Sequence, residues 1–369
     1  MTVYVLIMLF ILAGRFVINA NRSSKTRRNY LIVVFGVLCI VAAFRSYEVG
    51  TDTEQFYNAF KTILSLEWHD LDSLRYEYGF FALCKLLGYV SDDPQILLIG
   101  TSVFISFSVG RFIYKNSEDV SFSAFLFLSL NIYAQYLSLM RQALAICIIM
   151  LGLERLKKKK DIQFVIAVII AALFHRSAII CCMFILFTRL RYTKGMLGLT
   201  TVLTVAGFMF VEKLFVIVTN IIGYGNYSDS EFVVPNYFAA VCKAAVFLAV
   251  FIFGLLCIRN KEGYNLYSIS TKGFLTGRLS YGFLAFAMSV CLFSQIVAIK
   301  MIIMQRAVPY FDYFCLLWLP KAIYGIEDKS IRCLAKILVI VFTILYFVII
   351  NTFRQEWYGV VPYKTFVWP

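Results

Sequence analysis

The sequence predicts an all-α integral membrane protein that crosses the bilayer many times. Of its 369 residues, 61% are hydrophobic and only 15% are charged, whereas soluble domains are roughly half apolar and a quarter charged. Apolar runs recur along the whole chain, and no polar stretch is long enough for a separate soluble domain. We therefore expect a single transmembrane domain over residues 1–369.

Twelve apolar segments are expected to cross the membrane, since a bilayer core needs about 20 apolar helical residues and fewer where neighbouring helices shield the ends. They are 3–20, 30–46, 95–114, 120–138, 139–156, 162–174, 178–190, 195–211, 238–258, 279–299, 304–320 and 334–351. In the first segment the positive charges, beginning with Arg15, follow the apolar run instead of preceding it. This order indicates a first transmembrane helix and not a cleaved signal peptide.

Two regions are expected to depart from simple spans. Residues 47–77 form the longest predicted external loop, which should contain a short helix. Segment 78–90 is apolar but short and carries Lys85, so we expect a re-entrant or interfacial helix. The runs on either side of His175 are also short, and their apex is expected in a protein-lined cavity below the membrane surface.

Basic clusters orient the chain. Lys157–Lys160 follow an apolar run directly, and short cytoplasmic loops collect Lys and Arg. With this cluster inside, the predicted topology places 23 of the 35 basic residues in the cytoplasm and both termini outside. The net charge of +14 is thereby explained by topology, and nucleic acid is not an expected partner.

Polar residues that a membrane helix does not explain gather at the predicted outer ends of the spans. They are Arg45, Asp52, Arg75, Glu77, Arg141, Gln142, His175, Arg176 and Arg306. An arginine at the edge of hydrocarbon is costly and usually faces a cavity or a partner. Arg141 stands out because the eleven residues that follow Gln142 are apolar.

Several of these residues also have a purely structural interpretation. Arg45 could extend its head group to the interface, and Arg176 could be a solvated loop charge. His175 is one of only two histidines, and a lone histidine is more often structural than catalytic. Asp52 or Thr51 could accept the N-terminal amides of the short external helix.

The chemistry of the set favours an anionic ligand with several oxygen atoms. Guanidinium groups bind phosphate in a bidentate manner and keep their charge, and a neighbouring carboxylate or imidazole can accept a proton from a hydroxyl. These residues therefore predict a site for a lipid-linked pyrophosphate. Asp70-Leu71-Asp72 matches the DxD motif of nucleotide-sugar glycosyltransferases, but it lies on the predicted outer side and is interpreted as loop acidity. No HExxH, P-loop or GxSxG motif occurs.

The order of these residues resembles a known family. The sequence carries Arg45 with Gly50-Thr51-Asp52 and Tyr57, then Glu77-x-Gly79, Met140-Arg141-Gln142-x-Leu144-Ala145, Phe174-His175-x-Ser177-Ala178 and Gln305-Arg306 with Tyr310. This series is similar to the EpsG-like branch of the Wzy-type polysaccharide polymerases. The resemblance covers most of the chain.

The resemblance implies a glycosyltransferase of the bacterial inner membrane with a GT-C-like architecture and without a metal or other cofactor. Such enzymes join oligosaccharide units carried on undecaprenyl pyrophosphate at the outer leaflet, in O-antigen, capsule or exopolysaccharide synthesis. The implied partners are the lipid-linked donor and acceptor and membrane lipids, with a chain-length regulator as an open candidate.

The resemblance also implies roles for individual residues. Arg141 and Arg306 would hold the donor pyrophosphate and stabilise it as the leaving group, with Arg45 assisting. Gln142 and Arg176 complete this set of candidate pyrophosphate contacts. His175 is the first candidate for the base, and Asp52 and Glu77 are the alternatives.

Other functions remain open at this point. An O-antigen ligase-like transferase shares the lipid-pyrophosphate site, although such ligases usually carry a larger external loop than 47–77. A lipid-linked oligosaccharide flippase fits twelve spans but should show two related halves, which the sequence lacks. A membrane acyltransferase would need a paired His/Arg motif near the first helix, and none is present.

Overall fold

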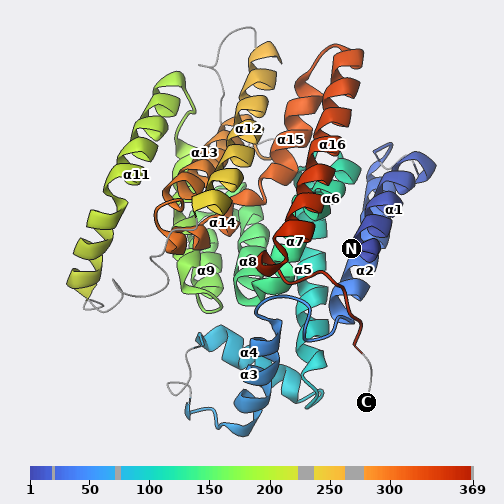
Figure 1. The fold of residues 1–369 in the computed structure, drawn as a ribbon, viewed down its shortest axis with the longest axis vertical. Helices are drawn as coiled ribbons and strands as arrows, with labels where there is room; N and C mark the ends of the chain where they lie inside the picture. Colours follow the sequence, from blue (N-terminus) through green and yellow to red (C-terminus); the bar gives the residue numbers. More distant parts are fainter. Residues whose placement is uncertain (19–20, 71–75, 223–236, 262–277, 367–369) are drawn as a thin grey trace. The chain divides into compact units, whose positions relative to one another are not determined.

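The computed structural model describes residues 1–18, 21–70, 76–222, 237–261 and 278–366. These residues form helices and connecting loops, and Arg45 and Thr365 are joined by an isolated β-bridge. The all-helical prediction is confirmed (Figure 1). The chain divides into two compact units, which are described separately below: unit 1 comprises Met1–Cys181 and Cys333–Pro369, and unit 2 comprises Cys182–Arg332.

Unit 1 contains most of the helices. They are α1 (Thr2–Ile18), α2 (Ser24–Ala43), α3 (Thr53–Ser65), α4 (Tyr78–Gly88), α5 (Gln95–Asn116), α6 (Val120–Ser129), α7 (Ile132–Ser138), α8 (Met140–Leu156), α9 (Asp161–Ala172), the 3-10 helix η2 at its boundary (Arg176–Cys182), most of α16 (Lys329–Phe353) and the 3-10 turn η8 (Gln355–Trp357). Helix α2 packs on α5, α5 on α8, and α8 on α9. Successive apolar segments thus form a contiguous bundle.

The predicted span 120–138 is broken into α6 and α7. The two helices are bent by 56° relative to each other. Asn131, between them, has a left-handed backbone with φ of 60°, which ends the right-handed helix at that point. The Asn351 amide of α16 donates to Asn131 Oδ1 at 2.7 Å, so a side-chain hydrogen bond holds the break against α16.

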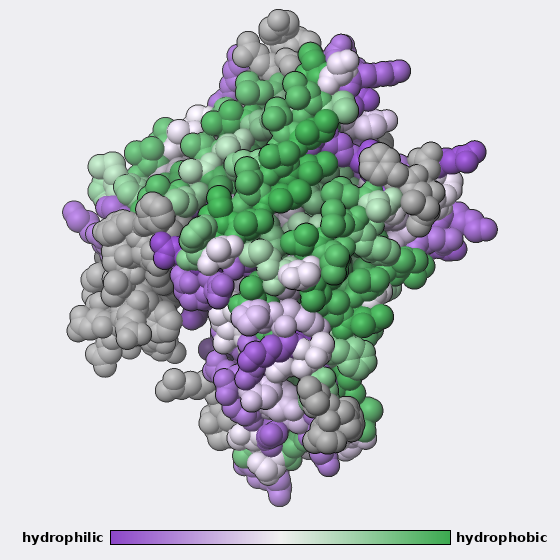
Figure 2. All heavy atoms as spheres, turned by 45° about the vertical axis from the view of Figure 1, so that its right-hand side comes forward, coloured by the Kyte–Doolittle hydropathy of each residue, from purple (hydrophilic) through white to green (hydrophobic). Residues whose placement is uncertain are grey.

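Helices α3 and α4 form a small lobe at one end of the longer helices of unit 1 (Figure 1). Phe56, Phe60 and Ile63 recur with helical spacing on α3 and pack in one core with Phe80 and Phe81 of α4. Figure 2 shows hydrophilic residues gathered over this lobe and hydrophobic residues over much of the helices above it. The short external helix and the short apolar helix predicted from the sequence are both present.

The C-terminal segment returns to the same end of unit 1. Its backbone pairs with the loop after α2, where Ser46 N donates to Lys364 O at 2.9 Å and Gly50 N donates to Gly359 O at 2.8 Å. The Tyr4 hydroxyl of α1 donates to Val360 O at 3.1 Å. The first residues of α1, the α2–α3 loop and the C-terminal segment therefore meet.

The opposite end of unit 1 is organised by Asp119, the N-cap of α6. Its carboxylate accepts from Phe122 N at 3.1 Å and pairs with Arg15 of α1 at 2.8 Å and with Lys336 of α16. Arg27 of α2 donates to Ser117 O at 2.8 Å. Basic residues that the sequence assigns to the cytoplasmic side thus connect the ends of four helices.

Unit 2 holds α10 (Met183–Arg189), α11 (Lys194–Ile222), α12 (Tyr237–Lys261), α13 (Tyr281–Val297), η7 (Ile302–Arg306), α14 (Pro309–Asp312) and α15 (Cys315–Gly325). Helix α13 packs against α10, α11 and α12, and α12 also packs against α15. Trp318 of α15 fills the space beside Gly254 of α12 and donates its indole N–H to Val250 O at 3.0 Å. The predicted span 304–320 is divided among η7, α14 and α15.

Five helices among the described residues are long and apolar enough to cross a membrane by themselves, and the bent pair α6–α7 adds a sixth if it counts as one span. Shorter apolar helices of 10–17 residues include α4, α9 and α13. The protein is therefore a polytopic α-helical membrane protein.

Candidate functional site

An ion pair between Arg141 and Glu77 lies where the α3–α4 lobe meets the bundle. Arg141 is the second residue of α8, and Glu77 occupies the N-cap position of α4. The guanidinium Nη1 bonds to Glu77 Oε2. The side chains are 22% and 14% exposed respectively, so the pair is sheltered but open on one side.

Three aromatic rings surround the Arg141 guanidinium. Its central carbon lies 5.0 Å from the ring centre of Tyr76, 5.5 Å from that of Phe56 and 6.0 Å from that of Phe80. Ring faces attract a cation without using its hydrogen-bond donors. The buried Nε of Arg141 indeed has no hydrogen-bond partner within the described residues. The rings thus hold the guanidinium without occupying its hydrogen-bond donors.

The turn after α9 brings His175 and Arg176 to this pair. Gly79 N donates to Leu173 O at 2.7 Å, and Arg176 N approaches Glu77 Oε1 at 3.4 Å. A Cβ on Gly79 would lie 2.7 Å from Leu173 O, so this close approach requires glycine. The beginning of α4 and the end of α9 are thus locked together.

The His175 side chain is already oriented by a neighbour. Its Nδ1 forms a hydrogen bond of 2.7 Å with Ser177 Oγ, and the ring is half-buried. A bond at Nδ1 fixes the ring and directs Nε2 elsewhere. Arg176 is exposed, whereas Gln142, next to Arg141, is 3% exposed.

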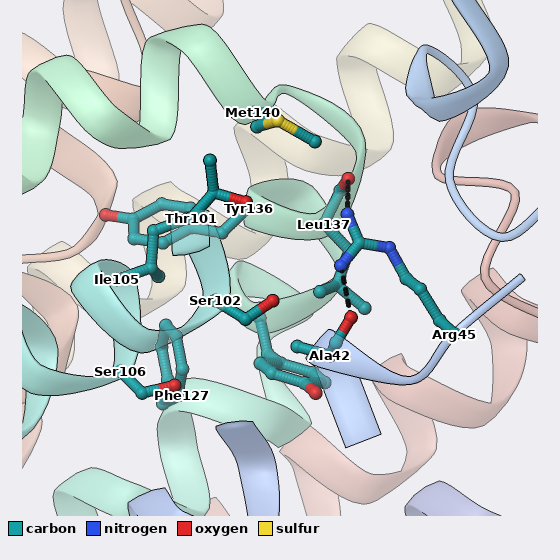
Figure 3. Close-up of a pocket in the computed structure, with 11 residues that line it drawn as sticks. Ala42, Arg45, Thr101, Ser102, Ile105, Ser106, Phe127, Tyr136, Leu137 and Met140 are labelled. Carbon is teal, nitrogen blue, oxygen red and sulfur yellow. Dashed lines mark hydrogen bonds between the residues drawn. The ribbon is translucent and has the colours of Figure 1, made fainter. Parts of the chain in front are cut away.

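Arg45 is placed differently. It is 2% exposed, and each of its nitrogen atoms donates to a backbone carbonyl. Nη1 donates to Ala42 O at 2.6 Å and Nη2 to Leu137 O at 3.2 Å (Figure 3). Nε donates to Val49 O at 3.3 Å. It therefore clamps the α2–α3 loop to the end of α7. Its predicted phosphate contact stays a prediction.

Asp52 lies at the N-cap of α3, half-exposed. Its side chain makes no capping bond to α3, so the capping role considered for it is not observed. Close by, Gly50 has a left-handed φ of 106°, and Thr53 Oγ1 donates to Val49 O at 2.8 Å. A tight turn, rather than a side-chain cap, starts this helix.

Tyr57 of α3 and Asp93 were not connected by sequence reasoning. The Tyr57 hydroxyl donates to Asp93 Oδ1 at 3.4 Å, and its ring lies 5.4 Å from that of Tyr47. Partial burial and the Asp93 carboxylate raise the pKa of the Tyr57 phenol above its ordinary value. The hydroxyl consequently stays protonated at neutral pH.

Arg306 belongs to unit 2, where it ends η7 and is exposed. Arg75, Leu71 and Asp72 lie outside the described residues.

Unit 2 also contains a pair that sequence reasoning missed: the buried carboxylate of Asp312 on α14 acts electrostatically on the ammonium of Lys243 on α12. Both residues lie within predicted membrane spans, where charged side chains are rare, and this position in the sequence could have identified them.

These observations define a polytopic α-helical membrane protein with an arginine–carboxylate site at one end of its first unit. A family model matches residues 28–365, nearly the whole chain, and the chain belongs to the EpsG family. This is a family of Wzy-like polysaccharide polymerases, so the resemblance inferred from the sequence motifs is confirmed. No curated protein and no solved structure matches the chain.

Proposed function

We propose that the protein polymerises oligosaccharide repeat units carried on undecaprenyl pyrophosphate, at the outer face of the bacterial inner membrane. The growing chain leaves its lipid and is transferred to a hydroxyl of the next unit, with the lipid pyrophosphate as leaving group. The Arg141–Glu77 pair carries this proposal, because it combines a cation for phosphate with a carboxylate for proton transfer.

In this mechanism the donor pyrophosphate takes the place of Glu77 beside Arg141. Phosphate offers the guanidinium two oxygen atoms and a greater charge than a carboxylate, and the Arg141 side chain is still 22% exposed to a ligand. The amides at the start of α8 favour the same anion. Arg306, Arg45, Gln142 and Arg176 are the further candidate contacts to the pyrophosphate.

Displacement from Arg141 would free the Glu77 carboxylate to act as the base. It would then accept the proton of the acceptor hydroxyl as that oxygen attacks the anomeric carbon. His175 and Asp52 are the alternative bases, and His175 lies on the turn that Arg176 N joins to Glu77. A single base and in-line attack give inversion at the anomeric carbon, since no second carboxylate is needed to form a covalent intermediate.

The proposal includes an architecture. Twelve spans in a GT-C-like arrangement, with both termini outside, place the α3–α4 lobe at the outer surface. The described helices that are too short to cross alone, such as α9, would complete their spans through adjoining turns and shielding by neighbouring helices.

The decisive experiment supplies the purified protein with lipid-linked repeat units and separates the products on a gel. Wild type should give a ladder spaced by one repeat unit. Arg141→Ala should lose it, and Arg354→Ala, a matched arginine that pairs with Glu356 at 3.6 Å, should keep it. Folding of each variant is checked by its elution and melting temperature.

Two variants separate binding from proton transfer. Glu77→Gln should still bind the donor lipid but transfer it at least about 100-fold more slowly, as expected for loss of a general base. Equal transfer by Glu77→Gln and a loss in His175→Ala would assign the base to His175. The absence of a ladder from folded wild type would overturn the polymerase proposal, and product linkages of the donor's anomeric configuration would overturn inversion.

A further inference from the structure

A groove opens on unit 1 between α5, α8 and α9, at the end of α8 opposite to Arg141. Its volume is about 890 Å³, within the range of about 300–1,000 Å³ common for ligand sites. Its apolar lining consists of Phe104, Ile148, Leu151, Gly152, Ile166, Ala167 and Ile170. The rim carries four exposed cations: Arg111, Lys115, Arg155 and Lys158.

These cations lack counter-charges. The acidic residue that lines the groove, Glu154, already pairs with Lys157 at 2.6 Å. Across the described ranges none of the four rim cations forms an ion pair. Burial lowers the pKa of Lys157, and repulsion from Lys115 and Arg111 adds to this effect. The rim therefore carries four closely spaced positive charges that no neighbouring carboxylate in the described part of the chain neutralises.

The geometry matches one leaflet of a membrane. Along α5 the groove runs from Phe104 to Lys115, which is about 16 Å at about 1.5 Å per residue. This is close to half of the roughly 30 Å hydrocarbon core. Arg111 and Lys115, four residues apart on α5, lie on one helix face, and Lys158 follows Arg155 in the turn after α8.

We propose that this groove binds one anionic glycerophospholipid of the leaflet at this end of unit 1. Its phosphate would contact the four rim cations, and an acyl chain would lie over Phe104, Ile148 and Ile166. Basic pockets between membrane helices commonly recognise such head groups. An acyl chain fits a groove of one-leaflet depth, whereas a long polyprenyl chain would extend well beyond it.

The charge half of the proposal is tested with the purified full-length protein after delipidation in detergent. Phosphatidylglycerol is titrated in, and bound lipid is counted by native mass spectrometry. Arg111→Gln/Lys115→Gln should raise the dissociation constant by about 30-fold, since each basic side chain contributes about fivefold at an anionic surface. The matched pair Lys25→Gln/Arg28→Gln, exposed on α2 near the same end, should change it by less than about twofold.

The apolar half is tested by filling the groove. Ile166→Trp places a larger side chain on the lining, while Ile162→Trp makes the same change one turn away at a residue that does not line the groove. The first variant should lose the bound lipid and the second should keep it. Both positions are exposed on α9, so neither change disturbs the core.

The outcomes separate this site from general surface charge. The proposal would be overturned if the two double-Gln variants weakened phosphatidylglycerol binding equally, or if neither weakened it. Phosphatidylcholine bound as tightly as phosphatidylglycerol would also overturn it. Displacement of phosphatidylglycerol by an equimolar polyprenyl phosphate would replace the proposed occupant. None of these readouts depends on polymerase activity.

Discussion

Arg45 and Arg141 lie at the same end of unit 1, and their surroundings differ in kind. The guanidinium of Arg45 is buried, and each of its three nitrogen atoms donates to a backbone carbonyl. That of Arg141 is partly exposed, stands against aromatic rings and has a carboxylate as its partner. A carbonyl of the main chain cannot leave, whereas a side-chain carboxylate can be replaced by another anion. The first arginine is built to hold the chain, and the second to exchange partners.

The largest expected effect is on stability at Arg45. Arg45→Ala leaves the buried carbonyls of Ala42, Val49 and Leu137 without this donor and should lower the free energy of unfolding by about 3–5 kcal/mol. Thermal unfolding of the purified protein in detergent measures this. Arg45→Lys should recover part of the loss. A stable but inactive Arg45→Ala protein would instead place Arg45 in the phosphate site.

Arg141→Ala should show the reverse behaviour. Loss of a cation that stabilises the leaving group is expected to reduce the polymerisation rate at least about 100-fold. The melting temperature should fall less than in Arg45→Ala, because the Glu77 carboxylate left behind is still reached by solvent. Arg141→Lys should remain strongly impaired, since lysine lacks the planar fork. Rates from repeat-unit ladders, compared with melting curves, decide this. A large fall in melting temperature would make Arg141 a second structural clamp.

Gly79 positions Glu77, the partner of Arg141, because it holds the start of α4 against the end of α9. Gly79→Ala brings a methyl group against the Leu173 carbonyl and should cost about 1–3 kcal/mol of stability by overpacking, together with a loss of activity as Glu77 shifts. Gly36→Ala on α2 is the control, since nothing lies within 4 Å of its added methyl group. Unfolding and ladder assays on the pair should differ clearly. Equal effects at both positions would remove the positioning role of Gly79.

The smallest effect is expected at Tyr57. The pKa of the Tyr57 phenol is raised in the folded protein, so folding favours the protonated phenol. This contribution of Tyr57 to stability is fully present at any pH below the ordinary tyrosine pKa of about 10. That contribution declines only as the pH rises above this value. Tyr57→Phe should therefore leave the shape of the pH–rate profile between pH 6 and 9 unchanged. A shifted profile would show that Tyr57 or its partner Asp93 takes part in proton transfer.

The candidate site was predictable as a set of residues but not as a set of contacts. Arg141, Glu77 and His175 are conspicuous in the sequence because polar side chains interrupt or border apolar runs. The pairing of Arg141 with Glu77, 64 residues away, depends on how α4 packs at the start of α8. Arg45 borders an apolar run just as Arg141 does, so the sequence does not distinguish the two. The partners of Arg45 are backbone carbonyls, which every residue has, and they therefore leave no mark in the sequence.

The sequence by itself determined the helical membrane class, the family and most helix positions, since apolar periodicity and length are local properties of the chain. Tertiary structure alone decided where helices break, as at Asn131, and which arginine donates to backbone carbonyls and which to a carboxylate. It also decided that the basic residues of α5 and α8 share one groove rim. Each of these features forms where segments that are distant in the sequence come into contact. The free energy of such a contact depends on three-dimensional packing and not on the residues next to it in the sequence.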